Sequence, residues 1–211
     1  MGLEKLFKDY REKKSAIQKR LHEFEAVWSF PERKIFSELC FCICTPQSNA
    51  VQCDKAIKTL EENGDLYNGG LSDIRKGLRA VRFPNNKSRY IIQARGFFAK
   101  NGSFRIKELV DTRNIKETRL WFANNVKGLG LKEASHFLRN IGFGSDIAIL
   151  DVHILRNMKK YGAIKEIPAN LSQKVYVSIE ERLRAFSGKV KIPMAELDLL
   201  FWSSATGKIF K

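Results

Sequence analysis

The sequence predicts an all-α fold, and three observations support this prediction. Apolar residues recur at intervals of three and four through most of the 211 residues, as they do on the buried face of a helix. Short polar stretches with Gly, Asn and Pro separate these segments. Alternating strand patterns are almost absent, and the stretch KVKIP at 189–193 is too short to change the fold class.

Individual helices follow from their apolar stripes and their ends. Pro31 suits the first turn of the second helix, and Ser48 and Ser72 are candidate caps for two later ones. Asp151 follows the apolar run IAIL and occupies the N-cap position of another helix. In chain order, the expected helices cover residues 3–28, 31–43, 48–64, 72–81, 87–102, 116–126, 131–142, 152–162, 172–188 and 193–205.

Basic residues outnumber acidic ones by a wide margin. The chain has 38 Lys and Arg against 23 Asp and Glu, which gives a formal net charge of +15. Such a field attracts polyanions, so nucleic acid is the first partner to consider, with a generally basic surface as the alternative. The charged N-terminus has no apolar signal core, and no apolar run approaches membrane-spanning length. We therefore expect a cytoplasmic, nucleoid-associated protein without membrane contact.

Four clustered cysteines raise the question of a metal site. Their spacing, C-x-C-x-C-x8-C, differs from the paired C-x2-C of zinc sites. Residues two apart on a helix do not share a face, and the surrounding segment IFSELCFCICTPQ is apolar. We expect core thiols and no metal site; the four are Cys40, Cys42, Cys44 and Cys53.

The segment 119–142, RLWFANNVKGLGLKEASHFLRNIG, is expected to form two helices joined by a tight hairpin. Gly128 and Gly130 permit backbone conformations and close approaches that a Cβ would obstruct. The second helix begins near Leu131, and its free N–H groups would suit a phosphate. An ordinary αα-hairpin explains the glycines equally well.

Lys132 and Asp151 are the candidate reactive groups. A lysine in the first turn of a helix opposes the helix dipole, and with burial this favours the neutral amine that a nucleophile requires. Asp151 has a strong structural explanation as a helix cap. The two roles are compatible, because a capping carboxylate held by backbone N–H groups can still face a cleft.

Several motifs resemble those of the helix-hairpin-helix, Gly/Pro-Asp superfamily of DNA base-excision glycosylases. GLGLK at 128–132 and LDVHILR at 150–156 resemble its hairpin and aspartate motifs. CTPQSNAVQCDKA at 44–56 and RFPNNKSRYIIQ at 82–93 are similar to its upstream segments. Together they cover most of residues 30–160. The ending GKIFK at 207–211 resembles the type 2 8-oxoguanine DNA glycosylase/AP lyase branch.

This resemblance implies two helical lobes with the active site in the cleft between them. One lobe, 34–143, would be six-helix-barrel-like and end in the hairpin; the other would combine 1–33 with 144–211. Because no cysteine follows Cys53, the iron–sulfur cluster of endonuclease III cannot form, and we expect no cofactor. A monovalent cation at the hairpin is left open, and Lys127 replaces the proline that commonly precedes the hairpin.

The function implied is base-excision repair of double-stranded DNA that contains oxidised guanine, by a monomer. Lys132 would form a Schiff base with the sugar and cut the strand by β-elimination, while Asp151 would assist by accepting a proton or stabilising positive charge. An endonuclease III-like enzyme for oxidised pyrimidines is the alternative within the enzyme class. A non-catalytic DNA-binding module is the alternative outside it.

The resemblance also assigns the base pocket and the DNA contacts. Trp202 would stack on the flipped base, or pack in the core beside Phe201, and Phe83 is a second candidate for stacking. The carboxylate of Lys211 would accept hydrogen bonds from the base edge, although chain ends are usually disordered. Gln47 would fill the gap left by the flipped nucleotide, or simply end a helix. The assigned DNA-binding residues are therefore Gly128, Gly130 and Gln47.

Overall fold

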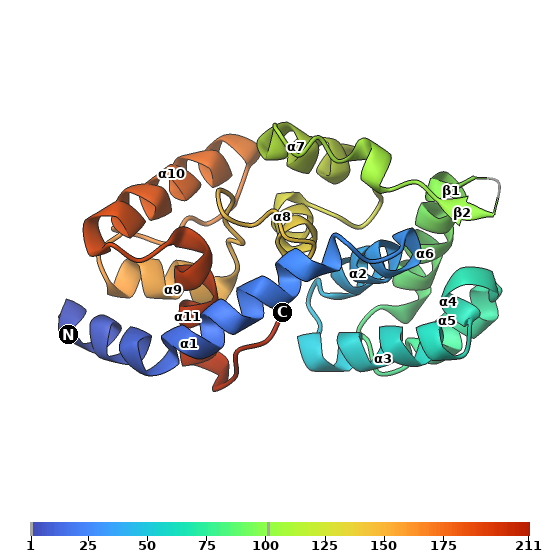
Figure 1. Ribbon diagram of the computed structural model, residues 1–211, viewed down its shortest axis with the longest axis horizontal. Coiled ribbons are helices and arrows are strands. Elements are labelled where there is room, and N and C mark those ends of the chain that lie inside the picture. Colours follow the sequence, from blue (N-terminus) through green and yellow to red (C-terminus); the bar gives the residue numbers. More distant parts are fainter. Residues whose placement is uncertain (1, 101) are drawn as a thin grey trace.

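The computed structural model describes residues 2–100 and 102–211, and within them the protein is almost entirely helical (Figure 1). A two-stranded antiparallel pair, β1 (Ala99–Lys100) and β2 (Ser103–Phe104), and the 3-10 turn η1 (Lys107–Leu109) complete it. The helices are α1 (Leu3–Val27), α2 (Glu32–Cys44), α3 (Ala50–Glu62), α4 (Asp65–Asn68), α5 (Leu71–Gly77), α6 (Pro84–Phe98), α7 (Ile115–Asn125), α8 (Leu131–Asn140), α9 (Val152–Lys160), α10 (Gln173–Val190) and α11 (Met194–Thr206).

The buried apolar side chains form two clusters. One is built from residues between Ile35 and Ile147, most of which belong to α2–α8. The other combines the inner face of α1 with residues from Ala148 to Phe201, which belong to α9–α11 and the segment before α9. In Figure 1 these groups occupy opposite ends of the molecule, with α1 running from one toward the other and α8 near the middle. We propose the two clusters as the cores of the two expected lobes.

The helix caps show where local sequence reasoning was right and where it was wrong. Asp151 caps α9 as predicted, accepting from the N–H groups of His153 and Ile154. Ser48 does not cap α3, because the neighbouring Asn49 accepts from the first-turn N–H groups instead. Ser72 does not cap α5 either. Gly70 holds that position, and its N–H donates to the side chain of Asp73 three residues later.

The predicted hairpin joins α7 to α8, and its two glycines have different reasons to be glycine. Gly128 has a φ of 94°, and a Cβ there would lie 2.6 Å from the ring of Tyr90. Gly130 has an extended backbone that any residue could adopt, and its N–H donates to Glu133. Only Gly128 is therefore required for the shape of the turn.

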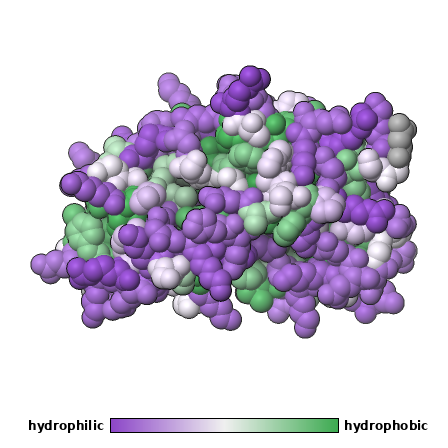
Figure 2. Space-filling view, viewed as in Figure 1, coloured by the Kyte–Doolittle hydropathy of each residue, from purple (hydrophilic) through white to green (hydrophobic). Residues whose placement is uncertain are grey.

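The surface agrees with the high charge. Figure 2 shows one face covered mainly by hydrophilic side chains, with scattered apolar patches. The four cysteines lie buried in the first cluster as free thiols, where the helical spacing predicted them. Among the described residues, no helix combines the length and the apolar character needed to cross a bilayer.

Candidate active site

A cavity of about 620 Å³ lies where residues of the two clusters meet. Its walls come from the loop before α3, from α8, from the first turn of α9, from α11 and from the C-terminal tail (residues 207–211). This volume lies within the range of roughly 300–1,000 Å³ that small-molecule pockets occupy. Five of the predicted site residues line it: Gln47, Lys132, Asp151, Trp202 and Lys211.

Lys132 lies in the first turn of α8, directly after the hairpin, and its side chain lines the cavity. Its side chain is only 28% exposed, and its Nζ lies 2.9 Å from Oε1 of Glu133. The other carboxylate oxygen of Glu133 accepts from the N–H of Gly130 at 3.2 Å. Glu133 therefore connects the hairpin backbone directly to the candidate nucleophile.

Asp151 reaches the same cavity from the start of α9. Its Oδ1 accepts from the N–H groups of His153 and Ile154, both at 2.8 Å. These bonds fix the orientation of the carboxylate, and its second oxygen carries none of these backbone bonds. The capping residue therefore also lines the cavity, which is the position that its predicted catalytic role requires.

The tail places Lys211 between the cavity and the interior. Its Nζ lies 2.9 Å from Glu38 Oε1 and 2.7 Å from Asp54 Oδ1, and the side chain is 10% exposed. Burial opposes the ammonium charge, but these two carboxylates outweigh it and raise the pKa of Lys211 above its usual value. The ammonium also lies 4.5 Å from the centre of the Phe41 ring. Two buried carboxylates therefore anchor the last residue.

The aromatic candidates differ in position. Trp202 lines the cavity and stacks against Phe210 of the tail with 6.2 Å between ring centres, whereas the adjacent Phe201 is fully buried in the core. Phe83 lies outside the cavity lining, is 46% exposed and has a φ of 59°. Gln47 stands in the lining and also has a positive φ, of 55°. The structure thus brings Trp202 and Gln47 to the cavity and leaves Phe83 apart.

The cavity wall also contains three buried titratable groups that were not among the predicted site residues: His136, Arg139 and Asp198. Asp198 lies 3.5 Å from Arg139. Burial raises the pKa of Asp198 to about 7; the charge of Arg139 opposes this rise, and that of Asp151 adds to it. Burial, together with the charges of Arg139 and Lys132, holds the pKa of His136 well below its usual value. His136 is therefore neutral near pH 7, and among the described residues its Nε2 has no hydrogen-bond partner.

Glu133 and Asp198, which were not among the predicted site residues, each had a signal in the sequence. Glu133 follows Gly130 by three residues, which is the spacing of a capping box. Asp198 interrupts an apolar run in α11, between Leu197 and Leu199. A charge inside an apolar stripe indicates a buried partner or a functional group.

Comparison with known proteins identifies the family. A family model described as 8-oxoguanine DNA glycosylase matches residues 17–192, most of the chain. The chain belongs to the 8-oxoguanine DNA glycosylase family. Within this family, the 8-oxoguanine DNA glycosylase/AP lyase of Fusobacterium nucleatum is 46% identical over 206 residues, which are 97% of this chain and 95% of that protein. The one from Methanocaldococcus jannaschii is 40% identical over 203 residues, 94% of this chain and 93% of that protein.

Solved structures of the family share the fold. The M. jannaschii 8-oxoguanine glycosylase/lyase in complex with a 15mer DNA containing 8-oxoguanine has a TM-score of 0.86 at 35% identity, covering 98% of this chain and 99% of that one. The 8-oxoguanine DNA glycosylase of Thermotoga maritima has a TM-score of 0.87 at 33% identity, covering 99% and 98%. These matches confirm the all-α helix-hairpin-helix fold. They also favour an enzyme that acts on 8-oxoguanine over the two alternatives, an enzyme for oxidised pyrimidines and a non-catalytic DNA-binding module.

Proposed function

We propose that this chain is a bifunctional 8-oxoguanine DNA glycosylase/AP lyase that acts in base-excision repair. It binds double-stranded DNA containing oxidised guanine as a monomer, removes the base and cuts the strand. The observation that carries this proposal is the meeting of Lys132, Asp151, Trp202 and Lys211 around one cavity. The family relatives, which carry the same activity in their names, support it.

DNA binding rests on charge and on the hairpin. The net charge of +15 favours association with phosphates through counterion release. The hairpin at Gly128 and Gly130 would contact the backbone, while Gln47 would occupy the space left by the flipped nucleotide. Because Glu133 already accepts from the N–H of Gly130, we assign the phosphate contact to the remaining N–H groups at the start of α8.

The chemistry begins with the neutral amine of Lys132. Its nitrogen lone pair attacks C1′ of the flipped nucleotide, and the C1′–N9 bond breaks with its electron pair leaving on the base, which takes up a proton. The attached nitrogen then loses a proton, its lone pair forms the C=N of a Schiff base as the C1′–O4′ bond opens, and O4′ takes up a proton. Loss of a C2′ proton and cleavage of the C3′–O3′ bond complete the β-elimination.

Asp151 would stabilise charge on the sugar, and Trp202 and the tail would recognise the base. The Asp151 carboxylate, fixed by its two backbone N–H donors, would stabilise positive charge that builds on the sugar as the base departs. Trp202 would stack on the base, and the main-chain carboxylate of Lys211 would read its edge. We assign no cofactor or iron–sulfur cluster to this chemistry, because no cysteine follows Cys53.

Borohydride trapping tests the proposal directly. The protein is incubated with an 8-oxoguanine duplex in the presence of borohydride, which reduces a Schiff base to a stable amine. We expect a covalent protein–DNA adduct from the wild type and none from Lys132→Gln. Lys127→Gln is the matched control, since Lys127 is an exposed lysine of the same hairpin and its variant should still be trapped. If the wild type is trapped on no lesion, the lyase assignment is wrong.

A further inference from the structure

The segment between α8 and α9 determines where Asp151 stands, yet it has no regular secondary structure of its own. Ala148 and Leu150, which lie three residues and one residue before Asp151, are each 1% exposed. Their backbone N–H and C=O groups are therefore removed from water and need partners from elsewhere in the fold. The source of these partners decides what holds Asp151 in place.

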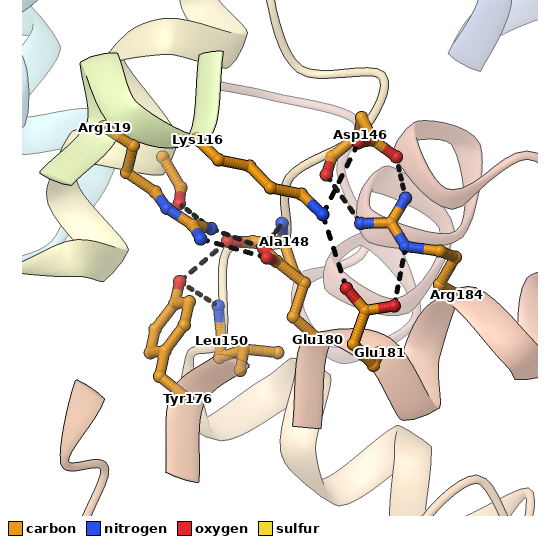
Figure 3. Close-up of polar contacts among 10 residues, drawn as sticks. Lys116, Arg119, Asp146, Ala148, Leu150, Tyr176, Glu180, Glu181 and Arg184 are labelled. Atoms are coloured by element: carbon orange, nitrogen blue, oxygen red, sulfur yellow. Dashed lines mark hydrogen bonds and ion pairs between the residues drawn. The ribbon is translucent and has the colours of Figure 1, made fainter. Parts of the chain in front are cut away.

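Two side chains of α10 form hydrogen bonds with these backbone groups, as Figure 3 shows. Tyr176 donates its hydroxyl to the Ala148 carbonyl at 2.7 Å and accepts from the Leu150 N–H at 3.2 Å. Glu180, one turn later, accepts from the Ala148 N–H at 2.7 Å. Burial raises the pKa of Tyr176 well above its usual value, so the hydroxyl keeps the proton that it donates. The backbone before Asp151 is thus held on both sides.

Glu180 also ties this segment to the hairpin. It is fully buried and forms a two-pronged ion pair with Arg119 of α7, with 3.0 Å between Arg119 Nη2 and Glu180 Oε2. Arg119 in turn lies 3.4 Å from the hydroxyl of Ser135. Ser135 stands on α8 one turn after Lys132, so the same network connects the helix of the nucleophile to the segment of the aspartate.

Stability alone is a poor explanation for this network. Burying two charges carries a desolvation penalty that can equal or exceed their attraction, and well-packed apolar side chains often replace such pairs without loss. The Arg119–Glu180 pair does fix geometry, because two parallel hydrogen bonds between guanidinium and carboxylate set the orientation of both side chains. A neighbouring ion-pair cluster in Figure 3 offers a contrast: Glu181 is half exposed and pairs with Arg184 at 3.1 Å.

We propose that Tyr176 and Glu180 are positioning residues of the glycosylase reaction, which set the Asp151 carboxylate relative to Lys132 by clamping the 148–150 backbone. The inference rests on the proposed function, since it assigns Asp151 a role in base removal. Neither residue lies in the lining of the cavity that Lys132 and Asp151 share. Tyr176 lines a second pocket that Lys132 also reaches, but its hydroxyl is bonded to the Ala148 carbonyl and the Leu150 N–H. We therefore expect the effect of Tyr176 and Glu180 to pass through the backbone that they hold.

Single-turnover excision of 8-oxoguanine from a duplex tests this inference. Tyr176→Phe removes both hydrogen bonds to the segment while keeping the ring in the core, and Glu180→Gln removes the charge that pairs with Arg119. We expect each to slow excision by about 10- to 100-fold, the scale of a misplacement near 1 Å, with unchanged affinity for the lesion duplex. Glu181→Gln, on the adjacent position of α10, is the matched control and should stay within about twofold of wild type.

A double-mutant cycle separates positioning from a general loss of structure. If Tyr176 acts through Asp151, Tyr176→Phe should cost less than about twofold when introduced into Asp151→Asn. Equal losses in both backgrounds would overturn the inference, as would a Tyr176→Phe rate within about twofold of wild type. Should Glu180→Gln fail to fold, Tyr176→Phe alone decides. A wild type without any excision would instead refute the proposed function.

Discussion

Lys132 and Glu133 form an ion pair at the start of α8, with 2.9 Å between Nζ and Oε1. The resemblance assigned Asp151 to assist Lys132, and the structure adds Glu133 as a second carboxylate, one that pairs with Lys132 directly. The Lys132 side chain is 28% exposed, so solvent screens part of the attraction, whereas Glu133 is largely buried. Glu133, held by the Gly130 N–H, therefore orients the lysine at the start of α8.

Replacing Glu133 with Gln should slow Schiff-base trapping. Gln keeps an oxygen for the Gly130 N–H but loses the carboxylate that holds Lys132 Nζ at 2.9 Å. The lysine should then take up its reactive position less often, so we expect the trapping rate to fall by about tenfold, the scale of misplacement effects. Trapping rates measured with an abasic-site duplex, on which no base must be removed, would show this.

The chain offers a close control for the Glu133 variant. Asp73 accepts from the N–H of Gly70 at the start of α5, the same arrangement of glycine and carboxylate, and no ion pair joins it to a described lysine. Asp73→Asn should leave the trapping rate unchanged. A Glu133→Gln trapping rate equal to that of the wild type would show that the ion pair has no influence on the nucleophile.

Asp151→Asn should separate the capping role from the chemical one. Asn is as good an N-cap as Asp, so the thermal unfolding midpoint should change little. Base excision should slow by about 100- to 10,000-fold, because the negative charge beside the sugar is lost. Single-turnover rates and DNA affinity would be measured together, and affinity should be retained. Normal turnover in this variant would reduce Asp151 to a cap.

Local features of this chain were predictable from sequence, and the reason is that they depend on few residues. The stripe of α1 and the Asp151 cap involve contacts within one or two helical turns. Even so, Ser48 and Ser72 were wrong as caps: Asn49 takes the first-turn N–H groups of α3, and α5 begins at Leu71, which places Ser72 inside its first turn. The presence of a helix was thus more predictable than the identity of the residue that caps it.

The long-range pairs could not be predicted. Glu180 and Arg119 are 61 residues apart, and Lys211 and Glu38 are 173 apart. Each is one of many charges in a chain that is 29% charged, and only the packing of the helices selects its partner. The family resemblance predicted that Lys132, Asp151, Trp202 and Lys211 would share a site. It gave no indication of the side chains that hold them there.

The anchoring of Lys211 leads to a prediction about substrate choice. Glu38→Gln removes one of the two carboxylates that hold the Lys211 ammonium, so the tail should lose its fixed position at the cavity. We expect removal of 8-oxoguanine to fall by about tenfold or more, the scale of misplacement effects, while cleavage at a preformed abasic site is nearly unchanged. Deletion of Lys211 should give the same pattern.

Comparison of the two substrates under identical conditions would check the Lys211 prediction. Glu61→Gln is the control, since Glu61 forms an ion pair with Lys34 in the same region of the fold and lies outside the cavity lining. It should affect neither substrate. Equal losses on both substrates in the Glu38 variant would argue against recognition of the base by the tail.

His136 should make the stability of the protein fall in mild acid. Burial and the charges of Arg139, Lys132 and Lys211 hold its pKa well below its usual value, so the folded protein keeps His136 neutral where the unfolded chain takes up a proton. The stabilising contribution of the neutral imidazole is present above about pH 6.5 and is lost as the pH falls, at up to about 1.4 kcal/mol per pH unit. Denaturant unfolding between pH 7.5 and 5, values chosen to span roughly that range, would reveal this slope.

The His136→Gln variant should flatten this slope by the equivalent of one proton, whatever its absolute stability. His22 lies on the exposed side of α1, so His22→Gln should leave the slope as it is in the wild type. The change in slope is the decisive quantity, because an uncharged Gln in the same buried place cannot take up the proton. If both variants kept the wild-type slope, the acid sensitivity would have to come from groups other than His136.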